Sequence, residues 1–235
     1  RQILADVVCE AAVIRAFEDL PVKLMAEEHG VRNLQSNPSL LLLLDGIDGS
    51  ARFLGRAPSG AHGTILSVYS GTNPSYAQYL CAAMADFESG RLYLATRKQG
   101  VSVLHDGKLS GVRLAQRPLK PGQLRISGSI PASGALYGEK LRALQPEDYF
   151  SWVEAIKRIF EGQADAIVES TRKGNLEHAA LYGMVVEAGG VVVTLDGRDL
   201  GIREFMTFGQ HRTEGIIAAR SADVAEEVRR RLVGG

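Results

Sequence analysis

The sequence predicts an α+β fold, and three patterns along its 235 residues support this. Between residues 63 and 111, short apolar stretches alternate with turn residues, which is typical of an antiparallel meander of strands. After residue 123, helical and strand patterns alternate, as in an α/β unit. The segment 118–122 between them is polar and rich in turn formers. We therefore expect an N-terminal α+β half at residues 1–117 and a C-terminal α/β half at residues 123–235.

The first elements are expected from periodicity and from helix-ending residues. Apolar residues recur at three- and four-residue intervals over residues 2–20, which predicts an amphipathic helix that ends before Pro21. A short strand or turn is expected at 22–28 and a polar loop at 28–39. The run Leu40–Leu44 is typical of a strand that is covered on both faces.

The rest of the chain continues the two patterns. Further strands are expected at 64–69, 79–86, 91–96, 101–105, 112–114, 124–127, 164–169, 190–194 and 216–219. An Asp106-Gly107 hairpin turn is expected in the meander. Further helices are expected at 135–144, 149–161, 177–188 and 222–232.

Composition narrows the function classes. The 27 Lys and Arg residues balance the 27 Asp and Glu residues, so no broad basic face is available for nucleic acid. The longest run of leucines has five residues, far short of the roughly 20 that a membrane span needs. Cys9 and Cys81 lie in apolar stretches without metal-ligand spacing, so we expect them to be reduced and buried. A cytoplasmic location is expected on this basis.

The hexapeptide Asp45–Ser50 carries the strongest indication of chemistry. Its two carboxylates, three residues apart at the end of a buried strand, can converge on one divalent cation, and hard cations prefer oxygen ligands. Gly49 and Ser50 then permit a tight turn whose N–H groups can face a phosphate at a helix N-terminus. An ordinary turn accounts for this string equally well, because Asp, Gly and Ser are common in turns.

Two other acidic segments favour the metal interpretation. Glu27, with Glu28 beside it, stands 18 residues before Asp45, and the intervening loop can fold back to add a third carboxylate. Glu177 begins an alanine-rich helix, where an acidic side chain can point out of the N-terminus into a cleft.

These residues resemble the signatures of the inositol monophosphatase family, within the lithium-sensitive, magnesium-dependent sugar phosphatases. The family's Asp-Pro-Ile/Leu-Asp-Gly-Thr/Ser signature is similar to residues 45–50, and its upstream Glu-Glu pair is similar to residues 27–28. Its second signature, Trp-Asp-x-Ala-Ala followed by Glu-Ala-Gly-Gly, aligns with residues 176–180 and 187–190. The resemblance extends over nearly the whole chain.

Three departures from the family pattern indicate a divergent member. Gly46 stands where proline is usual, which we expect to loosen the turn. Leu176 replaces the signature tryptophan, and Glu177 replaces the aspartate. The longer glutamate side chain puts the metal affinity at that position in doubt.

The resemblance implies a layered αβαβα sugar-phosphatase fold, as in inositol monophosphatase and fructose-1,6-bisphosphatase, and Mg²⁺ as cofactor. The implied metal ligands are Glu27, Asp45, the Ile47 carbonyl, Asp48 and Glu177. The implied catalytic residues are Glu27, Asp45, Asp48 and Ser50, with Ser50 positioning the attacking water. The implied substrate contacts are Gly49, Ser50 and Glu177.

The function implied is Mg²⁺-dependent hydrolysis of a small sugar or inositol monophosphate by metal-activated water, in a homodimer. A pI near 7.2 and few basic residues near the motifs favour a monophosphate over a bisphosphate. Two alternatives remain open. One is a phosphatase for fructose 1,6-bisphosphate, histidinol phosphate or a 3′-phosphonucleotide, and the other is a non-catalytic relative.

Several other polar residues are candidates with ordinary explanations. Among the histidines, His178 has the best claim to a site role, because it adjoins Glu177. Glu187 is predicted to be a buried hydrogen-bonding residue rather than a ligand. Solvent exposure is the expectation for Arg52, Arg56, Arg172 and Lys173.

Overall fold

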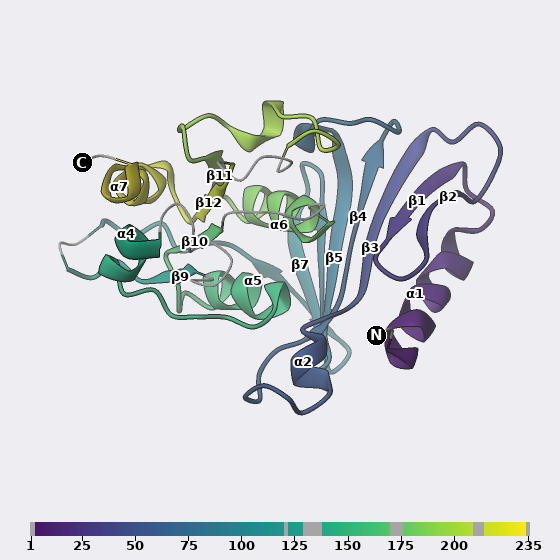
Figure 1. The fold of residues 1–235 in the computed structure, drawn as a ribbon, viewed down its shortest axis with the longest axis horizontal. Coiled ribbons are helices and arrows are strands. Elements are labelled where there is room, and N and C mark those ends of the chain that lie inside the picture. Colours follow the sequence, from purple (N-terminus) through teal and green to yellow (C-terminus); the bar gives the residue numbers. More distant parts are fainter. Residues whose placement is uncertain (1–2, 120–121, 129–137, 170–175, 209–213, 234–235) are drawn as a thin grey trace.

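The chain folds into alternating layers of helices and sheets (Figure 1). The computed structural model describes residues 3–119, 122–128, 138–169, 176–208 and 214–233. The first half contains α1 (Leu4–Phe17), β1 (Val22–Ala26), β2 (Gly30–Asn33), β3 (Leu40–Asp48), α2 (Ser50–Phe53), β4 (Gly63–Ser70), η1 (Tyr76–Gln78), β5 (Tyr79–Asp86), β6 (Arg91–Thr96), β7 (Gly100–His105) and β8 (Lys108–Val112). The second half contains β9 (Ile126–Gly128), α4 (Gly138–Ala143), α5 (Trp152–Phe160), β10 (Ala166–Glu169), α6 (Leu176–Glu187), β11 (Val191–Thr194), η2 (Leu200–Ile202), β12 (Ile216–Ala219) and α7 (Ala222–Val233).

Two sheets form the framework. The larger sheet has the strand order β2-β1-β3-β4-β5-β6-β7-β8, and its strands pair antiparallel except for β1 and β3, which are parallel. The smaller sheet has the order β11-β12-β10-β9, with β9 and β10 parallel. The larger sheet is built from residues 22–112 and the smaller from residues 126–219.

The helices fill the layers between and outside the sheets. α1 packs on the outer face of the larger sheet over β1 and β3, α5 and α6 lie between the two sheets, and α4 and α7 cover the far side of the smaller sheet (Figure 1). α6 is buried all round from His178 to Val185, because it is covered by a sheet on either side. The order of layers is therefore the αβαβα arrangement that the sequence motifs imply.

The buried face of α1 is acidic rather than apolar. Asp6 and Glu10 are almost fully buried together with Ile14, at the four-residue spacing of one helix face. Leu4 and Val8 belong to the apolar periodicity that predicts this helix, yet they are 78% and 56% exposed. The helix is thus turned so that two carboxylates point towards the sheet, which apolar periodicity alone does not predict.

Two strands of the larger sheet differ from the sequence expectation. β2 lies within the expected loop and pairs antiparallel with β1, but all four of its residues are exposed, so it shows no apolar alternation. β8 spans Lys108–Val112 instead of 112–114. The hairpin turn before β8 is confirmed, because Asp106 and Gly107 have φ values of 50° and 71°, as a tight two-residue turn requires.

An apolar strip lies on the solvent-facing side of β6 and β7. Leu92 is paired directly opposite Leu104, and Leu94 follows on the same face of β6. The three side chains are 44%, 40% and 44% exposed respectively.

Within the described part of the chain, no helix is both long and apolar enough to cross a membrane.

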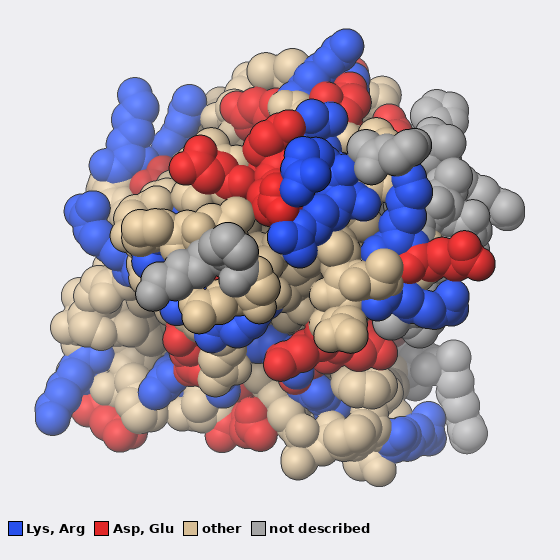
Figure 2. Space-filling view, turned by 90° about the vertical axis from the view of Figure 1, so that its left-hand side faces the viewer, with Lys and Arg blue, Asp and Glu red and all other residues tan. Residues whose placement is uncertain are grey.

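The face that carries α4 and α7 mixes charges of both signs. Figure 2 shows positive and negative side chains next to each other there. On α7, Arg229 pairs with Glu226, while Arg230 and Arg231 both pair with Glu227. Each of these surface ion pairs, whose members are one helical turn apart, stabilises the helix by only a few tenths of a kcal/mol.

The two cysteines are unpaired and half-buried. They are therefore less enclosed than the sequence predicts. Burial raises the pKa of both thiols, which lowers the thiolate fraction and with it their reactivity.

Gly46 is required by the packing of α1 on β3. A Cβ at residue 46 would lie 2.4 Å from Asp6 Oδ1, 2.6 Å from the Asp6 carbonyl oxygen and 2.9 Å from Glu10 Cγ. The backbone carbonyl cannot swing away as a side chain can. Glycine here therefore allows close contact between α1 and β3, which is a different reason from the looser turn expected from the sequence.

We predict that Gly46→Ala destabilises the protein by about 1–3 kcal/mol, because the added methyl group overpacks a site already closed by α1. Chemical denaturation measures the change. Gly111→Ala is the matched control, since the nearest atom to its Cβ would be 3.9 Å away, and it should change the free energy of unfolding by less than about 0.5 kcal/mol. Equal stability of the two variants would contradict the packing argument.

Candidate active site

The end of β3 places Asp45 and Asp48 in the interior. Leu41–Leu44 are fully buried, as the sequence predicts, and the strand continues through Asp45 to Asp48 with a register shift against β4 between these two residues. Asp45 is 3% exposed and Asp48 is 7% exposed. The irregular pairing frees the backbone between the carboxylates from the regular ladder.

Asp45 forms the centre of a carboxylate cluster. Oxygen atoms of Asp6, Glu27 and Asp45 all lie within 4.8 Å of one another. Asp45 Oδ1 is buried and has no hydrogen-bond partner within the described ranges. A buried carboxylate oxygen without a donor is costly, so this position fits a cation.

Glu27 reaches the cluster because a buried glutamate on α1 holds its turn. Glu27 follows β1, and its backbone N–H donates to the Leu44 carbonyl at 3.2 Å. Glu10 Oε1 accepts the Glu28 N–H at 3.1 Å, and Glu10 Oε2 accepts the His29 N–H at 3.0 Å and lies 2.7 Å from His29 Nδ1. Glu10 therefore fixes the backbone that directs Glu27 towards β3.

Asp48 is held by the N-terminus of α5. Its Oδ2 accepts the Val153 N–H at 2.7 Å. The helix is capped by Ser151, whose Oγ accepts the Glu154 N–H at 3.0 Å and donates to the Ala61 carbonyl at 2.5 Å. Unpaired N–H groups at a helix N-terminus stabilise a carboxylate, so α5 fixes the orientation of Asp48.

A buried ion pair fastens α2 to α5. Arg52 Nη2 lies 2.7 Å from Glu154 Oε2, and Arg52 Nη1 donates to the Ala61 carbonyl at 3.2 Å. Arg52 is 8% exposed, so the expectation of a solvated side chain is wrong for this residue. Because Glu154 belongs to the helix that holds Asp48, the pair ties the segment after β3 to the second half of the chain.

Two glutamates from the second half complete the acidic region. Glu177 lies in the first turn of α6, and its charge contributes to the raised pKa values of Asp45, Asp48 and Glu169. Glu169 ends β10 and accepts a hydrogen bond from the Tyr149 hydroxyl. The structure therefore brings together the carboxylates of Glu27, Asp45, Asp48 and Glu177, which are widely separated in sequence.

Burial and mutual repulsion shift the titration of these groups. Burial is the main cause that raises the pKa of Asp6 to about 6 and that of Glu169 to about 8. Burial, followed by repulsion from neighbouring carboxylates, raises the pKa of Asp45 far above its usual range. The pKa of Asp48 is also raised by burial, against the opposing hydrogen bond from Val153. A cation bound in the cluster would lower these pKa values again, because it stabilises the charged form of each carboxylate.

Gly49 and Ser50 form the turn from β3 into α2. Gly49 has a φ of 84°, in the left-handed region that favours glycine, and Ser50 is the first residue of α2. The Ser50 hydroxyl donates to the Ile47 carbonyl at 3.0 Å. Ile47, Gly49 and Ser50, all expected at the site, therefore lie next to one another. The Ser50 side chain contacts the Ile47 carbonyl, which the family resemblance implies as a metal ligand.

His178 and Glu187 have structural contacts. His178 is buried edge-on against Trp152 with 4.8 Å between ring centroids, and burial lowers its pKa to about 3. Glu187 accepts the Lys98 and Gly100 N–H groups at 2.7 and 2.8 Å, which confirms the hydrogen-bonding role expected for it. Arg172 and Lys173 lie outside the described residues.

Four polar residues of this region lie outside the sequence motifs, namely Asp6, Glu10, Tyr149 and Glu169. For the first two, a signal existed in the four-residue spacing of acidic residues on one helix face. Glu169 closes an expected strand, and strand ends in α/β units carry functional groups. Nothing local in the sequence marks Tyr149.

No family model and no curated protein sequence matches the chain. Solved structures do match it over almost its full length. The extragenic suppressor protein SuhB from Bartonella henselae aligns with a TM-score of 0.76 at 18% identity, covering 100% of this chain and 86% of that one. A Ca-bound inositol monophosphatase family protein from Staphylococcus aureus aligns with a TM-score of 0.72 at 18% identity, covering 100% and 84%.

A third structure, described as an inositol monophosphatase–fructose 1,6-bisphosphatase, aligns with a TM-score of 0.73 at 19% identity, covering 97% of this chain and 83% of that one. Identities this low establish the shared architecture. Together with the layer order, they show that this chain has the α+β fold of the inositol monophosphatase family proteins.

Proposed function

We propose that this protein is a Mg²⁺-dependent phosphatase that hydrolyses the phosphate monoester of a small sugar or inositol. The observation that carries the proposal is the convergence of carboxylates around the buried, unpartnered Oδ1 of Asp45. Such a concentration of negative charge is unfavourable by itself and becomes favourable once divalent cations bind. The Ca-bound structural neighbour supports a metal site in this fold.

The donor set suits Mg²⁺, which prefers oxygen ligands. The proposed ligands are Glu27, Asp45, the Ile47 carbonyl, Asp48 and Glu177. Bound Mg²⁺ would neutralise phosphoryl charge and make a water molecule more acidic. The chain fixes these ligands in advance, since Glu10 holds the Glu27 turn and α5 holds Asp48. Asp6 adds a carboxylate from α1 beside Asp45, and the Ile47 N–H donates to it at 2.9 Å.

The turn after β3 would receive the phosphate. The N–H groups of Gly49 and Ser50 are proposed to bind phosphoryl oxygens, as residues at this kind of turn into a helix do. The Ser50 hydroxyl already donates to the Ile47 carbonyl, so its oxygen can accept a hydrogen bond from water and orient that water. Ser50 is therefore proposed to position water and not to attack phosphorus.

The charge of the site favours a substrate with a single phosphate group. The acidic surroundings of the cluster favour one phosphate over two, as the near-neutral pI also does. A bisphosphatase remains the second candidate, because one structural neighbour carries both activities in its description. We also propose, from the family resemblance, a cytoplasmic homodimer.

The direct test is phosphate release, with and without Mg²⁺, from a panel of inositol monophosphate, fructose 1,6-bisphosphate, histidinol phosphate and a 3′-phosphonucleotide. We expect Mg²⁺-dependent hydrolysis, fastest with a monophosphate. Asp48→Asn should lower turnover by about a thousandfold or more, because a bound metal contributes several kcal/mol. The asparagine oxygen can still accept the Val153 N–H, so the fold should persist.

The exposed Asp223 on α7 provides the control for that variant. Asp223→Asn removes the same charge far from β3 and should keep full turnover. Activity of Asp48→Asn within a few-fold of the unmodified protein, or hydrolysis that persists in EDTA, would disprove the proposed mechanism.

Ser50→Ala should lower kcat by about 10²–10³-fold, the range for one positioning or acid–base contact. No phosphoenzyme should form in either protein, because carboxylates and metal would activate water directly. Hydrolysis of a chiral phosphate in ¹⁸O-water should proceed with inversion at phosphorus. Trapped phosphoserine at residue 50, or retention of configuration, would show a covalent mechanism instead.

Metal binding should also stabilise the fold in a pH-dependent way. Raised pKa values mean that the folded protein holds these protons more tightly than the unfolded chain. The stability from these groups is therefore complete below pH 4 and is lost as pH rises through about 6 for Asp6 and about 8 for Glu169. The Tm of metal-free protein should fall between about pH 4 and 8, and Mg²⁺ should raise it more at pH 8 than at pH 6.

Thermal denaturation in EDTA or Mg²⁺ measures this effect. Asp45→Asn should reduce the Mg²⁺ response, whereas Glu226→Gln, at an exposed position on α7, should leave it unchanged. An equal Mg²⁺ effect on all three proteins would locate the cation outside the cluster.

A further inference from the structure

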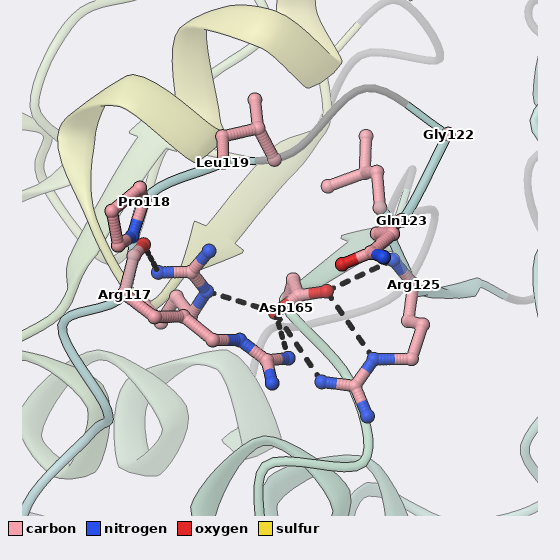
Figure 3. A pocket seen from close by; sticks show the side chains of 9 residues that line it. Arg117, Pro118, Leu119, Gly122, Gln123, Arg125 and Asp165 are labelled. Carbon is pink, nitrogen blue, oxygen red and sulfur yellow. Dashed lines mark hydrogen bonds and ion pairs between the residues drawn. The ribbon is translucent and has the colours of Figure 1, made fainter.

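A pocket lies at the opposite end of β10 from Glu169. It has a volume of about 640 Å³ and is bordered by the start of β9, the start of β10 and the end of β12. Figure 3 shows Arg117 and Arg125 on either side of Asp165, with Pro118 and Leu119 above them. None of its lining residues belongs to the carboxylate cluster around Asp45.

The pocket holds three guanidinium groups and one carboxylate among the described residues. Asp165 Oδ1 accepts Arg117 Nη2 at 2.7 Å and Arg220 Nε at 2.8 Å. Asp165 Oδ2 accepts the Arg125 backbone N–H at 3.0 Å and Arg125 Nε at 3.4 Å. Three positive charges against one negative charge leave a surplus of two.

The buried arginine is the fixed part of this arrangement. The Arg220 side chain is 5% exposed, and its Nη1 donates to the Arg117 carbonyl at 2.5 Å and lies 3.4 Å from the Ala115 carbonyl. The charges of Arg220 and Asp165 neutralise each other in the interior, where the Asp165 side chain is 2% exposed. The surplus charge therefore belongs to Arg117 and Arg125.

Arg117 and Arg125 present their charge to solvent in a fixed orientation. Their side chains are 47% and 41% exposed, and both are bound to the same carboxylate. In the described part of the chain, Asp165 is the one acidic group within ion-pair distance of either. Because Asp165 already orients the guanidinium groups of Arg117 and Arg125, an anion that binds them costs little additional side-chain entropy.

The shape of the pocket indicates an anion attached to a larger body. Its volume is within the range of small-molecule sites and exceeds the size of a phosphate ion. Pro118, Leu119 and Leu124 add apolar lining next to the arginines. A guanidinium group can bind two phosphate oxygens at once. A ligand with one carboxylate would neutralise only half of the surplus charge of Arg117 and Arg125, whereas a phosphate group carries enough charge for both.

We propose that this pocket binds a small organic molecule through a phosphate or pyrophosphate group, at a site separate from the catalytic cluster. The anionic group lies between Arg117 and Arg125, and the organic body packs on the apolar lining. This inference is independent of the phosphatase proposal, since no residue of the carboxylate cluster takes part.

Isothermal titration calorimetry in EDTA tests the proposal with two probes, inorganic pyrophosphate and ADP. EDTA leaves the carboxylate cluster without divalent cations, so that its negative charge repels anions. We expect one site per chain for each probe, with ADP bound more tightly because of its organic body. Arg117→Gln/Arg125→Gln should weaken both by tenfold or more, since each removes a charged hydrogen bond.

Two variants serve as controls. Arg15→Gln/Arg32→Gln removes the same charge from exposed positions on α1 and β2 and should retain both affinities. Asp48→Asn should also retain them, which separates this site from the catalytic one. The single variant Arg117→Gln, at the more exposed arginine, provides the same test if the double variant does not fold.

Three results would overturn the proposal. They are the absence of saturable binding of either probe, equal weakening by Arg15→Gln/Arg32→Gln, and loss of binding in Asp48→Asn. ADP affinity no higher than that of pyrophosphate would disprove the role of the apolar lining.

Discussion

Placing several carboxylates together in the interior costs free energy, and many contacts around β3 offset that cost. The Ile47 N–H binds Asp6, and the α5 N-terminus binds Asp48. On α1, the Glu10 carboxylate receives two backbone N–H groups of the turn after Glu27. These hydrogen bonds join α1 to β3 and to the turn after β1, and they join β3 to α5, so the acidic cluster can form only when all of these segments are in place.

The compensation is incomplete at one atom. Asp45 Oδ1 is buried and lacks a donor in the described part of the chain, while Asp48 and Asp6 have theirs. The carboxylates of Asp6 and Asp48 are each held by a backbone N–H group, whereas Asp45 Oδ1 is left to bind a cation. The hydrogen bonds thus distinguish two kinds of carboxylate: Asp6 and Asp48 are held in place by the backbone, and Asp45 has an oxygen atom available for binding. Burial, followed by the charges of Asp48 and Glu177, raises the pKa of Asp45.

The sequence predicted the elements whose residues show regular periodicity or continuous burial. The leucine run of β3, the meander from β4 to β7 and the last helix are confirmed. It did not predict β2, since an exposed edge strand has no apolar alternation. It did not predict that Asp6 and Glu10 share the buried face of α1 with Ile14, because the partners of these two carboxylates lie far away in sequence. The four carboxylates of the motifs do converge, whereas Arg52 is buried by a glutamate 102 residues later, which no local pattern shows.

The leucine strip on β6 and β7 affects how the molecule behaves in solution. Leu92 and Leu104 face each other across the two strands with about two fifths of each side chain in contact with water. Contact between two such surfaces releases ordered water, so its free energy becomes more favourable on moderate warming. Sulfate strengthens such contacts by exclusion from protein surfaces, and urea weakens them. Any contact between copies of this chain through this strip should therefore be stronger in warm sulfate solution than in the cold at low salt.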